Sequence, residues 1–182
     1  MKQIYKISLL GFLVILLTSC AVAGLTNDYN KLSNQNKLKI VKLTNFKNLS
    51  VNSIYELSAS ELKAELKNHS KSIVYVFTNG CTSNLCMPLS HYQNFAKENK
   101  YKLFLVMTGY ADLNETLVQN VNESLFSINS AYYNTKYRFK YTQFFENELQ
   151  NLPIKYKEKE YKGSLFFFER DKLIDIKKKL PL

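Results

Sequence analysis

The sequence is short of several features that would define a function. Its 182 residues contain only three cysteines, and therefore at most one internal disulfide, and only two histidines as imidazole ligands for a metal. Beyond residue 20 no apolar run is long enough to cross a bilayer. No internal repeat is present, and no motif typical of nucleic-acid binding occurs, so we expect no nucleic-acid partner.

The residues that are present suit one domain with a sizeable core, because 46% of them are hydrophobic. The formal net charge is +10, and without Lys2 and Lys6 it is 10 − 2 = +8. The remaining lysines are spread along the chain. Such a charge is typical of a basic outer surface beside anionic lipid headgroups.

The N-terminus has the pattern of a secretory signal. Lys2 and Lys6 precede an apolar stretch, Leu9–Leu17, which is too short for a stable transmembrane span. The following Leu17-Thr18-Ser19-Cys20 resembles the bacterial lipobox. That resemblance implies cleavage before Cys20, a lipid on Cys20, and a bacterial lipoprotein anchored in the cell envelope outside the cytoplasm. The alternative is an ordinary signal peptide in which the cysteine occurs by chance.

This pattern divides the chain into three parts. Residues 1–19 are the expected signal peptide, and residues 20–36 the expected lipid anchor and flexible tether, because they are polar and rich in asparagine. Residues 37–182 form the expected domain.

The most informative stretch lies around two cysteines. Ile73–Phe77 is a run of β-branched and aromatic residues, which predicts a buried central strand. A helical pattern begins at Leu89, so Cys81 and Cys86 lie between a strand and a helix start. Free N–H groups and the helix dipole favour a thiolate there. We expect the two cysteines to form a disulfide, with Cys81 the more reactive thiol and Cys86 more covered, inside the first helical turns.

The remaining segments predict an α/β domain. Residues 103–107 form a second continuous apolar run, which predicts a strand parallel to 73–77 with the 89–98 helix between them. The other expected elements are an edge strand over 38–43, a strand over 54–57, a strand or loop over 125–128, helices over 59–69, 112–121 and 132–149, and a β-hairpin formed by 164–168 and 173–176. Ser58 and Glu61 have the spacing of a capping box, which predicts the start of the 59–69 helix. An aromatic stripe on the 132–149 helix is expected in the core.

The order of these elements resembles the thioredoxin-like fold, a central mixed β-sheet flanked by helices and ending in a β-hairpin. The resemblance implies a thiol–disulfide oxidoreductase in which Cys81 and Cys86 are catalytic. Locally, Thr78, Gly80-Cys81-Thr82 and Cys86 are also similar to the Q-type peroxiredoxins. Val74 stands where that family has a proline, Lys162 or Gly163 where it has an arginine, and the cis-proline of most thioredoxin-like proteins also falls near Gly163.

Three other interpretations of the cysteine pair remain open. The disulfide can be a permanent staple, worth roughly 2 kcal/mol for so short a loop. Cys81, Cys86, Met87 and His91 are ligands that suit Cu(I). Alternatively, the protein is a non-enzymatic lipoprotein that binds a partner. We expect no cofactor, and the expected partners are the membrane, through the lipid, and the thiols of envelope proteins.

Overall fold

The computed structural model describes residues 24–83, 86–119, 121–157 and 159–181, and seven strands of this part form one mixed sheet in the order β1-β2-β5-β4-β3-β6-β7. Strands β1 to β5 are parallel, β6 is antiparallel to β3, and β7 is antiparallel to β6. The strands are β1 (Ile40–Lys42), β2 (Ile54–Leu57), β3 (Lys71–Phe77), β4 (Lys102–Met107), β5 (Leu125–Ile128), β6 (Leu165–Glu169) and β7 (Lys172–Lys177).

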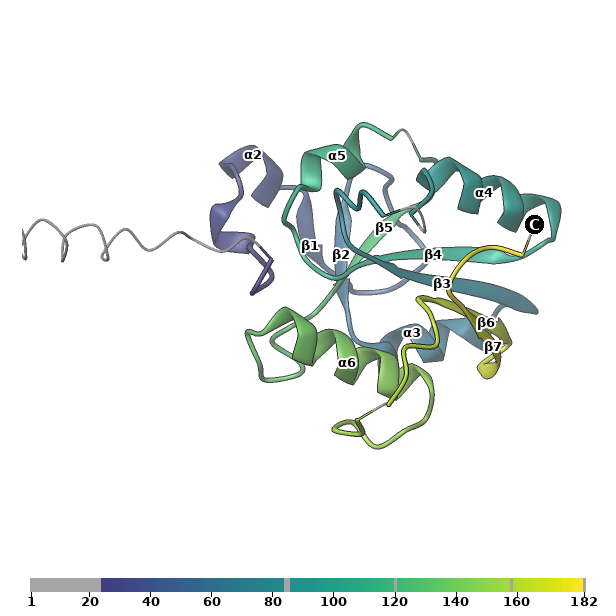
Figure 1. Cartoon of the computed structure of the whole chain (residues 1–182). Coiled ribbons are helices and arrows are strands. Elements are labelled where there is room, and N and C mark those ends of the chain that lie inside the picture. Colours follow the sequence, from purple (N-terminus) through teal and green to yellow (C-terminus); the bar gives the residue numbers. More distant parts are fainter. Residues whose placement is uncertain (1–23, 84–85, 120, 158, 182) are drawn as a thin grey trace, which may run out of the picture.

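Helices cover both faces of this sheet (Figure 1). Helices α3 (Ala59–Leu66) and α6 (Arg138–Leu149) pack on one face, and α4 (Leu89–Glu98) and α5 (Leu113–Leu117) pack on the other. Side chains alternate along β3, so Val74 and Val76 contact the first layer while Ile73, Tyr75 and Phe77 contact the second. This explains why the strand is a continuous apolar run, and it confirms an α/β sheet flanked by helices.

The predicted pairing of the two apolar runs is confirmed. Ile73 lies opposite Leu103 and Phe77 opposite Met107 in a parallel ladder, with α4 between the strands in sequence. The segment 125–128, which the sequence left open, is a buried strand, β5, between β4 and β2. The predicted hairpin is also present as β6 and β7.

Helix α3 begins with the predicted capping box. The Ser58 backbone N–H donates to Glu61 Oε2 over 2.8 Å, and Ser58 Oγ accepts from the Glu61 N–H over 3.2 Å. These two bonds satisfy N–H groups that have no partner within the helix. The helix ends at Leu66, three residues before the expected His69.

Two helices are shorter than predicted. Helix α5 covers only Leu113–Leu117 of 112–121, and α6 begins at Arg138, six residues after the expected start. The prediction that the aromatic stripe lies in the core is therefore only partly confirmed. Tyr141, Phe145 and Leu149 are buried, but Phe139 is 64% exposed. Phe139 lies about 200° around the helix from Tyr141, so both cannot face the core.

The segment expected to be a flexible tether is packed on the domain from Gly24 onward, which corrects the predicted boundary at residue 36. It contains a 3-10 helix, η1 (Tyr29–Lys31), and α2 (Asn34–Lys37). The Tyr110 N–H donates to the Asn27 carbonyl over 2.8 Å, and the Arg138 N–H donates to the Leu25 carbonyl over 2.9 Å. In Figure 1 this segment lies beside α5 and the start of α6, at the edge where the parallel strands end. We call this edge the carboxyl edge.

In the part of the chain that the structure describes, no helix has the length and apolar character needed to span a membrane.

Candidate functional site

The cysteine pair lies at the carboxyl edge, directly after the central strand β3. Cys81 and Cys86 are joined by a disulfide with their Cα atoms 6.0 Å apart, so the predicted bond is confirmed. Cys81 is exposed, and Cys86 is half-buried. A partner therefore has easier access to Cys81, in agreement with the sequence-based expectation.

The expectation that Cys86 lies inside the first turns of a helix was wrong. Helix α4 begins at Leu89, after Pro88, so Cys86 precedes it by three residues. The first helical N–H, on Leu89, donates to Gln119 Oε1 over 2.8 Å. The helix start is three residues away from Cys86, and one of its free N–H groups already donates to Gln119. It therefore stabilises a thiolate less than the sequence suggested.

Hydrogen bonds attach the turn before Cys81 to neighbouring elements. Buried Asn79 donates from Nδ2 to the Gly109 carbonyl over 2.9 Å, and its Oδ1 accepts from Thr116 Oγ1 over 2.6 Å. The Thr78 and Thr108 hydroxyl oxygens, at the ends of β3 and β4, are 3.1 Å apart. Cys81 therefore follows a turn that is held on β4 and α5.

Two carboxylates lie beside this turn. Gly80 has φ of +64°, and a Cβ built there would stand 3.1 Å from Asp112 Oδ2 and 3.0 Å from Glu115 Oε2. Only glycine fits this position without displacing those side chains. Both carboxylates are solvent-exposed, so their field is screened.

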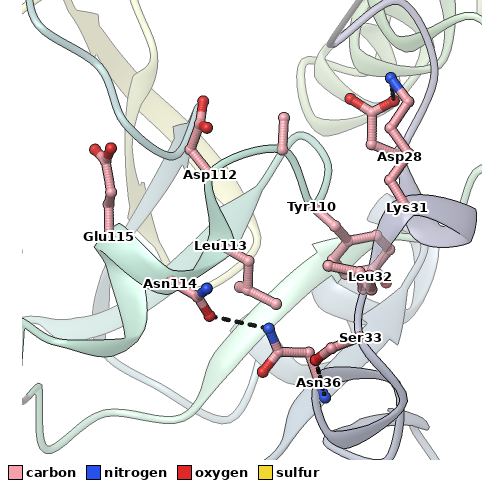
Figure 2. A pocket seen from close by; sticks show the side chains of 11 residues that line it. Asp28, Lys31, Leu32, Ser33, Asn36, Tyr110, Asp112, Leu113, Asn114 and Glu115 are labelled. Atoms are coloured by element: carbon pink, nitrogen blue, oxygen red, sulfur yellow. Dashed lines mark hydrogen bonds and ion pairs between the residues drawn. The ribbon is translucent and has the colours of Figure 1, made fainter. Parts of the chain in front are cut away.

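The same carboxylates border a depression of about 490 Å³ at the carboxyl edge (Figure 2). Residues 110–115 form one side, and residues 28–36 of the N-terminal segment form the other. The two sides are joined by a hydrogen bond from Asn36 Nδ2 to Asn114 Oδ1, of 2.9 Å. Buried Asp28 is paired with Lys31 at 2.9 Å, which with the Gly24 N–H holds its carboxyl pKa below the ordinary value against the opposing effect of burial.

The other residues that the sequence singled out are not gathered around the cysteines. His69 lies after α3 and bonds Glu65 Oε1 at 2.8 Å, while His91 is exposed on α4. Among the described residues, no three histidine, cysteine or acidic side chains converge on a possible metal position. Cys20 lies outside the described residues. Gly163, at the expected cis-proline position, precedes β6 with φ of +144°, and the described peptide bonds are all trans.

A second polar feature at this edge escaped the sequence analysis. A groove of about 280 Å³ lies between α6 and the ends of β3 and β4, lined by Thr78, Thr108, Thr142 and Glu146 among others. Thr142 Oγ1 is buried without a hydrogen-bond partner among the described residues. Burial raises the pKa of the Glu146 carboxyl to about 7. The i, i+4 spacing of Thr142 and Glu146 places both on one face of a helix, and it is the sequence feature that could have indicated this site.

Glu146 gives the domain a pH-dependent stability. Its pKa rises from 4.5 to about 7 on folding, so between these values the folded protein holds more protons than the unfolded chain. Stability therefore falls as pH rises through this window. Glu146→Gln removes this penalty, and we expect it to stabilise the protein by roughly 1–3 kcal/mol at pH 8 and little at pH 4.5.

Urea unfolding at the two pH values measures this effect. Glu169→Gln, at the exposed end of β6, is the matched control and should leave the pH dependence unchanged. Identical pH profiles for the Glu146→Gln variant and the unsubstituted protein would contradict the assignment.

Comparison with known proteins adds no relative: no family model, no curated protein and no solved structure matches this chain.

Proposed function

We propose that the protein is a bacterial lipoprotein, anchored outside the cytoplasm through Cys20, whose thioredoxin-like domain exchanges disulfides with protein thiols through Cys81 and Cys86. The observation that carries the proposal is a disulfide between an exposed and a half-buried cysteine, in the segment that follows the carboxyl end of the central strand. The order of strand, cysteines, helix and parallel strand, with an antiparallel hairpin at the end, supports the thioredoxin-like assignment.

The exchange runs through one mixed disulfide. A partner thiolate attacks Cys81 Sγ, the Cys81–Cys86 bond breaks, and Cys86 leaves as a thiolate. A second thiol of the same partner loses its proton, and the resulting thiolate attacks the partner sulfur of the mixed disulfide. Cys81 is released as a thiolate. The partner leaves as a disulfide, and the two electrons it has lost reside on the Cys81 and Cys86 thiols once each has taken up a proton. In the reverse direction the reduced pair reduces a partner disulfide.

The direction of exchange follows from the neighbouring charges. Asp112 and Glu115 lie beside Gly80. Negative charge next to Cys81 would disfavour its thiolate and thereby favour the disulfide over the open pair. The open pair is then a reductant, which transfers electrons to partner disulfides.

The same carboxylates also favour a second candidate function, a partner-binding lipoprotein in which the disulfide is a permanent staple. A poorly stabilised Cys81 thiolate is also a poor leaving group from the mixed disulfide, so exchange would not go to completion.

A trapping experiment separates these two functions. In Cys86→Ser the Cys81 thiolate can attack a partner disulfide, but Cys86 is absent and cannot resolve the mixed disulfide that forms. We therefore expect covalent complexes with envelope proteins that a reductant dissociates. Cys81→Ser is the matched control and should trap far fewer, because the remaining Cys86 is half-buried. Equal trapping by both variants, or none by either, would leave the staple function.

A further inference from the structure

The N-terminal segment limits how far the domain can lie from a lipid on Cys20. The described part of the chain begins at Gly24, whose N–H donates to Asp28 Oδ2 and which is packed against the Arg138 guanidinium. Four Cα–Cα steps separate Cys20 from Gly24, a reach of at most about 14 Å. If Cys20 carries the lipid, as the proposed function requires, the carboxyl edge must stay close to the membrane surface.

An exposed patch of aromatic and basic side chains lies beside Gly24. We name it the aromatic–basic patch, formed by Leu25, Lys136, Tyr137, Phe139 and Lys140. Leu25, Tyr137 and Phe139 are 50%, 38% and 64% exposed. Lys140 Nζ lies 5.3 Å from the Tyr137 ring centroid and 5.9 Å from that of Phe139, and Lys136 Nζ lies 5.7 Å from that of Tyr137.

Leu25 joins the patch to Gly24, where the described part of the chain begins. Its carbonyl accepts from the Arg138 N–H, and Leu25 and Phe139 line the same groove. The apolar side chains, the lysines and the point nearest the lipid therefore occupy one continuous area.

This composition fits a lipid surface. Aromatic rings occupy the interface between headgroups and acyl chains, and lysines interact with anionic headgroups while their stems contact apolar groups. We propose that the aromatic–basic patch docks on the anionic membrane surface in which Cys20 is anchored, an inference that rests on the proposed lipidation. The carboxyl edge, with Cys81, then lies close to the bilayer, so the partners of Cys81 are protein thiols or disulfides held at the membrane.

The absence of tryptophan from the chain allows a direct test. Phe139→Trp places one fluorophore in the patch, and Val51→Trp places one in the loop before β2, at the opposite edge of the sheet. The two positions are similarly exposed, at 64% and 52%. Each variant is isolated as the mature protein from membranes and reconstituted in vesicles of phosphatidylcholine and phosphatidylglycerol with brominated acyl chains.

We expect about a twofold loss of emission for Phe139→Trp and none for Val51→Trp, because only a ring in the interface contacts acyl chains. Adding Lys136→Glu and Lys140→Glu should lower the ratio of docked to undocked protein by about 30-fold per lysine, because each reversal removes one favourable charge and adds an unfavourable one. Equal emission from the two tryptophans, or docking that is insensitive to charge reversal, would overturn the proposal.

Mass spectrometry of the peptide containing Cys20 separates failure of this inference from failure of the anchoring. An acylated Cys20 with an unquenched Phe139→Trp variant overturns only the docked orientation. A Cys20 without acyl chains overturns the anchoring and the orientation together. Quenching that requires added membrane proteins would assign the patch to a protein and also overturn the proposal.

Discussion

Phe167→Asp is expected to abolish the folded domain. Phe167 is 6% exposed in β6, pairs with Ile73 of β3, and has its ring 5.8 Å from that of Tyr101. A carboxylate there would lie among apolar side chains on the α4 side of the sheet. An unpaired buried charge costs several kcal/mol, a large part of the roughly 5–15 kcal/mol that holds a domain folded.

Circular dichroism and urea unfolding test this expectation. Phe167→Leu is the matched control, because it retains an apolar side chain and should cost only about 1–1.5 kcal/mol. A soluble Phe167→Asp variant that unfolds cooperatively at nearly the same urea concentration as the control would show that β6 is not part of the core.

Gly163→Ala is the second substitution with a large expected effect. Gly163 has φ of +144°, and a Cβ there would stand 2.1 Å from the Lys177 carbonyl oxygen and 2.6 Å from the Lys178 nitrogen. Backbone cannot yield as a side chain can, so the end of β7 must move away. This movement would also uncover Leu180, which is 3% exposed in the core.

We expect a loss of roughly 2–4 kcal/mol in the free energy of unfolding from strained backbone and lost packing. Ser164→Ala changes the next residue, which has an ordinary φ, and should cost much less. Equal urea midpoints for the two variants would mean that the 177–180 segment adapts without cost.

The parts of the fold that the sequence predicted depend on local patterns. Strands β3 and β4 were found because they are apolar on both faces, and α3 because Ser58 and Glu61 satisfy each other at its start. Strand β5 has only four residues, too few for a periodicity to distinguish strand from loop. The position of β5 between β4 and β2 depends on long-range pairing that no local pattern encodes.

The predictions that were wrong concern segments whose structure depends on tertiary contacts. The predicted start of α6 was too early because the aromatic spacing continues into a turn, where Tyr133 is buried through bonds to Ala59 and Glu148. The polar composition of residues 24–36 suggested a tether, but packing of Tyr29 against Tyr110 and the bonds of Asn27 attach it to the carboxyl edge.

The candidate site was found only in part. The disulfide and the greater exposure of Cys81 followed from the position of the pair after a core strand. The proximity of Asp112 and Glu115 to Gly80 could not be predicted, since these carboxylates are more than thirty positions away in the chain. The charge beside the turn before Cys81 therefore depends on long-range packing that the local motif does not encode.

The reduction potential of the Cys81–Cys86 pair tests the proposed exchange most directly. Thiol trapping across a graded dithiothreitol series gives the midpoint. Cys81→Ser and Cys86→Ser are the references, because each keeps only one thiol of the pair. The proposal predicts a midpoint between roughly −300 and −200 mV, toward the reducing end because of the adjacent carboxylates. A midpoint below roughly −300 mV, outside the range in which envelope thiols exchange, would contradict it and identify the disulfide as a permanent staple.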